Sequence, residues 1–113
     1  MSNNTFKFQR GEVYLVQEHS VQGHEQKKTR PWVLVGVTPI NSARSTVIAV
    51  PLSTKAPVKP PLSIKIYNNN LIVCAVLDQL RALDKKRFLR FEGELTLHEM
   101  SLIDDGLRQI LSL

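Results

Sequence analysis

The feature that most constrains the fold of this chain is a series of short apolar runs joined by connections that are mostly too short for a helical crossover. Residues 12–16, 32–38, 46–52 and 71–77 are rich in apolar and β-branched side chains, and residues 62–67 alternate apolar with polar ones. Such runs are typical of strands. Because parallel neighbours need a connection of a dozen or more residues, usually a helix, the pattern predicts an antiparallel sheet.

The connections and the C-terminus complete this prediction. Residues 39–45 indicate a turn or a short helical turn, residues 53–61 a Pro-rich loop, and the three Asn residues at 68–70 a tight turn. From Thr96 the period changes, because Thr96 and Glu99 have capping-box spacing and apolar residues then recur at helical intervals. These apolar residues are Leu97, Met100, Ile103, Leu107, Ile110 and Leu111. The expected fold is mainly β with α: a small antiparallel barrel or sandwich with one terminal helix.

The composition indicates one small domain, residues 1–113, in which residues 1–9 form a loosely ordered leader. The N-terminus lacks the apolar segment of a signal peptide, and no apolar run approaches the roughly 20 residues of a membrane span. The single cysteine, Cys74, lies within an apolar run, which argues against a disulfide scaffold and favours a reducing compartment. We therefore expect a cytoplasmic protein with no membrane partner.

The charge distribution favours a polyanionic partner. The formal net charge is +5, and basic residues cluster at 27–30, 55–59 and 81–90. Such clusters are typical of nucleic-acid binding, although a generic basic surface has the same composition.

The loop at residues 23–31, Gly-His-Glu-Gln-Lys-Lys-Thr-Arg-Pro, is the strongest candidate for a site. It places an imidazole, a carboxylate, an amide, two ammonium groups, a hydroxyl and a guanidinium between two predicted strands. A rigid sheet that presents a loop dense in acid, base and cation is a common way to build a site.

Several short motifs together resemble the MazF/PemK family of toxins. The family has an R-G-[ED]-[VI] opening strand and then G-[SH]-E-Q-x-x-x-R-P, which residues 10–13 and 23–31 match position by position. Its V-P-x-[TS] step corresponds to residues 50–53, and its D-Q-x-[RK]-[TAS]-[IL]-D segment to residues 78–84. Arg87-Phe88, Gly93 to Leu95 and the terminal helix follow in the same order.

The resemblance implies an SH3-like barrel with a C-terminal helix. It also implies a sequence-selective, metal-independent endoribonuclease (an mRNA interferase) that cuts single-stranded RNA as the toxin of a type II toxin–antitoxin pair. Members of the family work as homodimers and are neutralised by a cognate antitoxin. We expect no cofactor, since His19, His24 and Glu25 have no standard zinc spacing.

The sequence departs from the family at two positions. In the PemK branch an Arg stands two residues before the Asp of the D-Q step, and here that position is Val76. An aliphatic side chain neither donates a proton nor neutralises a phosphate, so the catalytic scheme that uses this Arg does not transfer. Ser53 replaces the strand-end Thr of the MazF branch and keeps its hydroxyl.

The candidate catalytic residues match the chemical steps of metal-free RNA cleavage. The 2′-OH attacks phosphorus and leaves a 2′,3′-cyclic phosphate and a 5′-OH, which needs a base, a charge stabiliser and an acid. Arg30 suits the developing phosphorane charge, because its guanidinium can bind two oxygens; a surface ion pair with Glu25 is the alternative. Glu25 is the candidate base or an orienting group for Arg30, His24 a proton carrier, and Ser53 a donor to phosphate or a simple strand-end cap.

A second set of residues is expected to contact RNA rather than to react. Asp78 lies at a strand end, where it contacts RNA or accepts turn amides, and Gln79 either reads bases or holds the loop. Trp32 packs in the core or at a dimer interface, or stacks on a base. The complete set of expected substrate-binding residues is Asp78, Gln79, Lys27, Lys28, Thr54, Arg81, Lys85, Lys86 and Arg87.

Two other functions remain compatible with a basic β-barrel. One is a non-catalytic toxin that poisons gyrase, but that branch uses a Trp-containing C-terminal tail, and this chain ends without an aromatic residue. The other is an RNA-binding module, for which Val76 and Ser53 would be signs of decayed catalysis.

Overall fold

The computed structural model describes residues 5–18 and 28–113. This part of the chain holds strands β1 (Glu12–Gln17), β2 (Thr29–Leu34), β3 (Thr46–Ser53), β4 (Ser63–Asn68), β5 (Leu71–Val76), β6 (Arg81–Asp84) and β7 (Phe88–Glu94). Its helices are α1 (Thr38–Ala43) and α2 (Leu97–Leu111), with 3₁₀ turns η1 (Leu77–Gln79) and η2 (Lys85–Arg87). Within it, no helix is both long enough and apolar enough to cross a bilayer.

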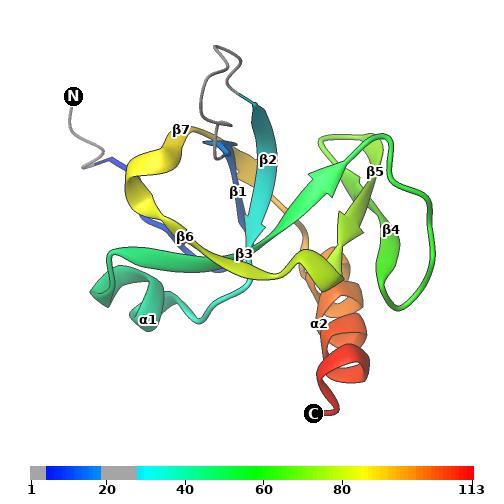
Figure 1. Ribbon diagram of the computed structural model, residues 1–113. Coiled ribbons are helices and arrows are strands. Elements are labelled where there is room, and N and C mark those ends of the chain that lie inside the picture. The colour runs from blue at the N-terminus through cyan, green and yellow to red at the C-terminus, as the bar shows by residue number, and fades with distance from the viewer. Residues whose placement is uncertain (1–4, 19–27) are drawn as a thin grey trace, which may run out of the picture.

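The strands form one curved antiparallel sheet, as the sequence predicts. Their order is β4-β5-β3-β2-β1-β7, and β6 pairs with the first half of β3. Strand β3 is central, since its last two residues leave β2 and pair with β5 instead. The described residues show no pairing between β6 and β7, so the sheet is barrel-like but open. Helix α2 lies against the β4–β5 hairpin, and α1 lies at the other end of the molecule (Figure 1).

The boundaries of β2 differ from the predicted strand at residues 32–38. The strand starts at Thr29, because Thr29 and Arg30 pair with Gln17 and Val16 across the β1–β2 ladder. It ends at Leu34, and α1 begins at Thr38 with Pro39 in its first turn, a position that needs no backbone N–H donor. The polar start of β2 therefore belongs to the sheet, which brings Arg30 onto a rigid element.

The segment before β1 is not the loose leader that the sequence predicts, at least from Phe6 onward. Phe8 is buried and its backbone N–H donates to the Tyr14 hydroxyl at 3.1 Å. That hydroxyl donates to Glu12 Oε1 at 2.6 Å. Phe8, Tyr14 and Phe88 pack with ring centroids 5.3–5.5 Å apart. Burial, together with the hydrogen bond to Glu12, raises the pKa of the Tyr14 phenol.

Two apolar clusters stabilise the sheet. One surrounds the aromatic residues Phe8, Tyr14, Trp32 and Phe88, with side chains from β1, β2, β3, β6 and the start of β7. The other lies between the sheet and α2, which contributes Met100 and Ile103. The Asn turn is confirmed, since Asn69 and Asn70 have φ values of 52° and 66° and join β4 to β5 in a two-residue hairpin.

Helix α2 begins as predicted, but its contacts differ in two respects. Thr96 Oγ1 accepts the N–H of Glu99 at 3.1 Å, whereas the Glu99 carboxylate accepts the N–H of Tyr67 on β4 at 2.5 Å. Leu97 is 90% exposed and Leu111 is also exposed, so the apolar stripe is narrower than its sequence spacing suggests.

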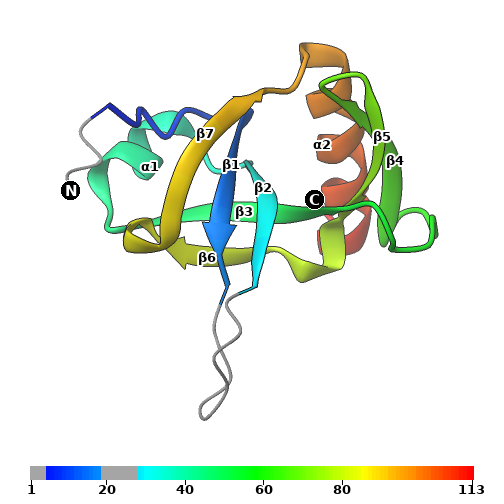
Figure 2. The ribbon, with the colours of Figure 1, turned by 90° about the horizontal axis from the view of Figure 1, so that it is seen from above.

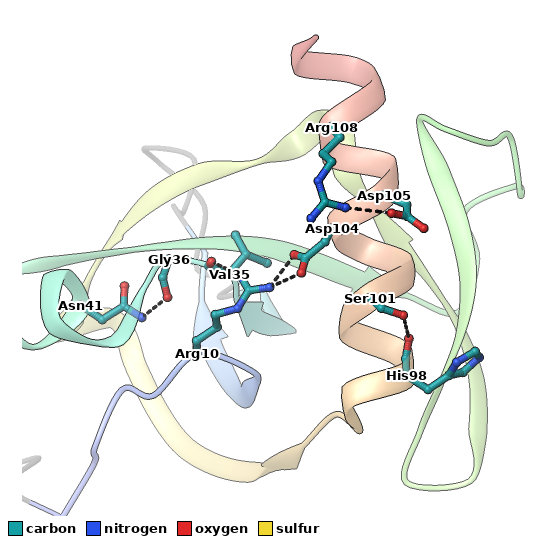
Figure 3. A network of polar contacts seen from close by, with 9 residues as sticks. All are labelled: Arg10, Val35, Gly36, Asn41, His98, Ser101, Asp104, Asp105 and Arg108. Carbon is teal, nitrogen blue, oxygen red and sulfur yellow. Dashed lines mark hydrogen bonds and ion pairs between the residues drawn. The ribbon is translucent and has the colours of Figure 1, made fainter. Parts of the chain in front are cut away.

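One guanidinium connects the start of the chain to this helix. Arg10 donates from Nη2 to both Asp104 oxygens at 2.5 and 2.6 Å, and from Nη1 to the carbonyl of Val35 at 2.5 Å (Figure 3). Arg10, from the first family motif, is therefore a structural residue.

Candidate active site

The predicted loop at residues 23–31 ends differently in the structure, because Thr29, Arg30 and Pro31 belong to β2 and pair with β1. The Glu18 backbone N–H donates to the carbonyl of Lys28 at 2.7 Å, so the β1–β2 ladder continues to the base of the loop. Residues 19–27 lie outside the described residues, and with them the predicted positions His24, Glu25 and Lys27. The structure describes Glu18 and Lys28 on either side of these residues, together with their surroundings.

A depression of about 500 Å³ opens beside the base of this loop. Its lining residues come from the ends of β1 and β2 and from the segment between η1 and β6. The structure thus brings together predicted site residues that are about fifty positions apart in sequence. The lining residues are Glu18, Lys28, Arg30, Trp32, Gln79, Leu80 and Arg81.

Arg30 is the central cation of this depression. Its side chain is 36% exposed, and its Nε lies 3.4 Å from Oε2 of Glu18. Lys28 and Arg81 also line the depression and add two further cations to it. Three cations against one carboxylate make a site that favours an anion, and a guanidinium can bind two phosphate oxygens at once.

Sequence reasoning missed Glu18 and offered Glu25 as the ion-pair partner of Arg30. Strand pairing is the signal that would have found it. Val16 lies opposite Arg30, and side chains two residues apart share a strand face, so Glu18 lies diagonally across from Arg30.

Trp32 is a core residue, because it is 2% exposed and belongs to the aromatic cluster. Its indole N–H donates to Glu18 Oε2 at 3.1 Å. The ring edge therefore reaches the depression, while its faces pack against the protein, which does not favour stacking on a base.

Ser53 and Thr54 lie outside the depression around Arg30. Ser53 Oγ accepts the backbone N–H groups of Lys55 and Ala56 at 3.1 and 3.0 Å, so it caps the turn after β3. Continuing the β2–β3 register would place Ser53 level with Arg30, but this pairing ends at Trp32 and Pro51, and Ser53 pairs with Cys74. Ser53 and Thr54 line a separate depression of about 140 Å³.

The remaining predicted cations form a second group at the other end of β6. Lys85 Nζ lies 4.7 Å from the centroid of the Phe8 ring and 3.5 Å from the carbonyl of Ser42. The Lys86 backbone N–H donates to the Asp84 carboxylate, which caps η2. Lys85, Lys86 and Arg87 are thus separated from the depression by the length of β6 (Figure 2).

Residues 9–111 match the family of PemK-like, MazF-like toxins of type II toxin–antitoxin systems. The chain belongs to this family. The resemblance in the sequence motifs and the expected function class are thereby confirmed at family level, since PemK/MazF toxins are endoribonucleases.

Solved structures support the same fold. An endoribonuclease in complex with its cognate antitoxin, from a mycobacterial species, is 25% identical with a TM-score of 0.76, and the match covers 93% of this chain and 95% of that one. MazE–MazF from Deinococcus radiodurans has a TM-score of 0.83 at 18% identity, covering 96% and 98%. An endoribonuclease from a mycobacterial species has a TM-score of 0.75 at 24% identity, covering 93% and 91%.

The PemK/MazF motifs occupy different environments in this structure. Asp78 is exposed in η1, and its backbone N–H donates to the carbonyl of Leu62 at 3.3 Å. Val76 is buried and pairs with Ser63 on β4. Among residues 5–18 and 28–113, no three His, Cys, Asp or Glu side chains gather in a way that could hold a metal ion.

Proposed function

We propose that this PemK/MazF family member is a sequence-selective, metal-independent endoribonuclease toxin that cuts single-stranded RNA. The observation that carries the proposal is the depression that Lys28, Arg30 and Arg81 line together beside the ends of β1 and β2. Cations from two distant segments converge there next to the loop that holds the family's Glu and His. RNA supplies both the phosphate that such a site binds and the 2′-OH that can attack it.

The proposed reaction uses the substrate's own nucleophile. A base takes the 2′-OH proton, the 2′-oxygen attacks the adjacent phosphorus, and the 5′-oxygen leaves with a proton from an acid. Arg30 stabilises the charge on the non-bridging oxygens. Glu25 and His24 are the proposed proton-transfer groups. Ser53, which lies outside the depression around Arg30, is proposed to donate its hydroxyl hydrogen to a different phosphate of the bound RNA. The products are a 2′,3′-cyclic phosphate and a 5′-OH.

The other residues of the depression are proposed to bind RNA. Lys28 and Arg81 contact flanking phosphates, and the Gln79 amide offers both donors and acceptors to a base edge. Lys27, Thr54 and Asp78 extend this surface. Lys85, Lys86 and Arg87 bind the RNA farther along β6.

We also propose that the protein works as a cytoplasmic homodimer and is neutralised by a cognate antitoxin. Two of the similar structures are of toxins bound to their antitoxins. The formal net charge of +5 favours an acidic partner segment. Since such a segment needs the same cations as RNA, the antitoxin and RNA should compete.

The decisive experiment is cleavage of a long single-stranded RNA by the purified protein in EDTA, followed by analysis of the product ends. We expect cutting at a short recurrent sequence, with 2′,3′-cyclic phosphate and 5′-OH termini. A substrate with one 2′-deoxynucleotide immediately 5′ of the cut should bind but stay intact, because it lacks the nucleophile. Efficient cutting of that substrate would exclude this mechanism, and RNA binding without any cleavage would instead indicate a binding module.

A further inference from the structure

Glu18 holds an unusual position at the rim of the candidate site. Its carboxylate is 18% exposed, accepts the Trp32 indole N–H at 3.1 Å and lies 3.4 Å from Arg30 Nε. Both contacts use the same oxygen, Oε2. One carboxylate oxygen therefore connects the hydrophobic core to the central cation of the depression.

The strand register explains this arrangement. Tyr14 lies opposite Trp32 and Val16 opposite Arg30, so Tyr14, Val16 and Glu18 share one face of the β1–β2 pair with these partners. Tyr14, Val16 and Trp32 belong to the aromatic cluster. Glu18 and Arg30 continue the same face beyond the edge of the core. A buried indole N–H needs an acceptor, and here Glu18 supplies it.

We propose that Glu18 is a positioning residue for Arg30. The Trp32 N–H fixes the carboxylate from the core side, and the carboxylate in turn attracts Arg30 through Nε. This contact is made through Nε. Within residues 5–18 and 28–113, no hydrogen bond engages the two terminal nitrogens of the guanidinium, and these are the atoms proposed to bind a phosphate. A long Arg side chain loses much rotamer freedom when it is held against the developing phosphorane charge, and an ion pair that restricts it beforehand lowers that cost in the transition state. The inference rests on the proposed cleavage of RNA at Arg30.

A competing role for the same carboxylate makes the opposite prediction. If Glu18 occupied the place of the substrate phosphate and had to be displaced, its removal would strengthen RNA binding and raise the cleavage rate. If Glu18 positions Arg30, its removal lowers the rate of the bound complex. Affinity stays the same or rises slightly, because a negative charge has left the site.

The test compares Glu18→Ala, Glu18→Gln and the matched control Glu92→Ala. Glu92 on β7 also pairs with an arginine, Arg90, at 3.1 Å, and its side chain is 23% exposed. At saturating RNA we expect Glu18→Ala to cleave about 10- to 100-fold more slowly, the cost typical of a misplaced catalytic group. Its Kd for the uncleavable 2′-deoxy RNA should not increase. Glu18→Gln should lose less, since the amide oxygen still accepts from Trp32, and Glu92→Ala should match the wild type.

Two further readouts separate positioning from general stability. Trp32 is the chain's single tryptophan, so its fluorescence emission reports the Glu18 contact directly and should change in Glu18→Ala but not in Glu92→Ala. In an Arg30→Lys background, where Nε is absent, Glu18→Ala should slow cleavage no further, because the two residues act as a unit.

Three results would each overturn the positioning role. Glu18→Ala could cleave RNA as fast as the wild type, or it could cleave faster and bind RNA more tightly. Alternatively, Glu18→Ala could slow cleavage in the Arg30→Lys background as much as it does in the wild type. If Glu18→Ala fails to fold, Glu18→Gln carries the same comparison. A wild-type protein that cuts no RNA would overturn the proposed function, and with it the role of Glu18. The positioning role alone would be overturned if the wild type and Glu18→Ala cut RNA equally well while Arg30→Ala did not.

Discussion

Arg30 is the residue on which the proposed chemistry depends, and its replacement gives the most direct prediction. We expect Arg30→Ala to lower the RNA cleavage rate by about two to four orders of magnitude, because removal of one donor to a developing oxyanion costs roughly 2.7–4 kcal/mol and this donor is charged. Single-turnover cleavage measures the loss, and circular dichroism checks that the fold persists. Arg108→Ala is the control, since Arg108 lies on α2 and pairs there with Asp105. Near wild-type cleavage by Arg30→Ala would remove Arg30 from the mechanism.

For single residues, the sequence predicts the chemistry of the candidate site better than it predicts which side chains contact one another. The motif identified Arg30 as the cation, and the structure brings Lys28, Gln79 and Arg81 to it. Sequence proximity favoured Glu25 as a partner, whereas cross-strand geometry selects Glu18, twelve positions away. Ser53 illustrates the same limit, because its hydroxyl caps a turn that only the path of β3 reveals.

Among the elements, the β4–β5 hairpin gives a prediction about stability. Asn70 adopts φ of 66°, a conformation that costs an ordinary L-residue about 1–2 kcal/mol. We therefore expect Asn70→Val to lower the free energy of unfolding by about that amount, while Asn70→Gly, which adopts this φ without strain, leaves it unchanged or raises it. Urea denaturation of the three proteins provides the measurement, and equal midpoints for the Val and Gly variants would contradict the expectation.

The first strand gives a prediction about pH. Burial and the bond to Glu12 raise the pKa of the Tyr14 phenol above its ordinary value near 10. Above that pH the unfolded chain loses this proton while the folded protein keeps it. The unfolded state then binds fewer protons, and the free energy of unfolding falls as pH rises. The contribution of the protonated Tyr14 phenol to the free energy of unfolding is fully present below about pH 10 and is lost progressively as the pH rises above it.

Thermal unfolding between pH 8 and 11 tests this effect of Tyr14. Tyr14→Phe should remove part of the alkaline loss of stability, although near neutral pH it should be less stable by about 1–3 kcal/mol, because the buried Glu12 loses a hydrogen-bond donor. Tyr67→Phe is the control, since Tyr67 is exposed on β4 and should keep the alkaline slope of the wild type. Equal slopes for wild type and Tyr14→Phe would refute the argument.

Five of the seven strands and the terminal helix were predictable from the sequence, whereas β6 and β7 were not among the predicted apolar runs, and the ends of the elements were less predictable. The Thr96 cap and the Asn turn carry local signals that the structure confirms. No local sequence pattern predicts that β2 starts at Thr29, because its first residues are polar and belong to the strand through their pairing with β1. Likewise Glu99 was expected to cap its own helix, but its carboxylate binds a strand that is more than thirty residues away in sequence.

On the scale of the whole molecule, the cations fall into two groups separated by β6, which spans about 13 Å at roughly 3.3 Å per residue. We expect the double reversal Lys28→Glu with Arg81→Glu to flatten the salt dependence of RNA affinity for every RNA that the protein cuts. The log–log slope should change by roughly 0.7 for each phosphate contact that is lost. Lys86→Glu with Arg87→Glu should flatten it only for longer RNA that reaches the second group.

Fluorescence anisotropy between about 50 and 200 mM salt measures these slopes. Arg108→Glu is the matched control, because Arg108 lies on α2, which packs beside the β4–β5 hairpin (Figure 2). If both double variants flattened the slope equally for short and long RNA, the two groups would not lie along one RNA track.

The global arrangement was predictable as far as an antiparallel sheet with a terminal helix. The sequence could not show that β1 pairs with β7, because these strands are separated by more than seventy residues and nothing local links them. It also could not show that the sheet stays open between β6 and β7.

The ion pair of Arg10 with Asp104 and the hydrogen bond of Arg10 to Val35 join the chain just before β1 to α2, which has a consequence for folding during synthesis. Asp104 lies on the last helix, and β1 obtains its partner β7 only after most of the polypeptide has left the ribosome. A nascent chain interrupted before α2 lacks Met100 and Ile103 and leaves one apolar cluster uncovered. We therefore expect incomplete translation products to expose an unfinished core to proteases, and folding to require the helix α2.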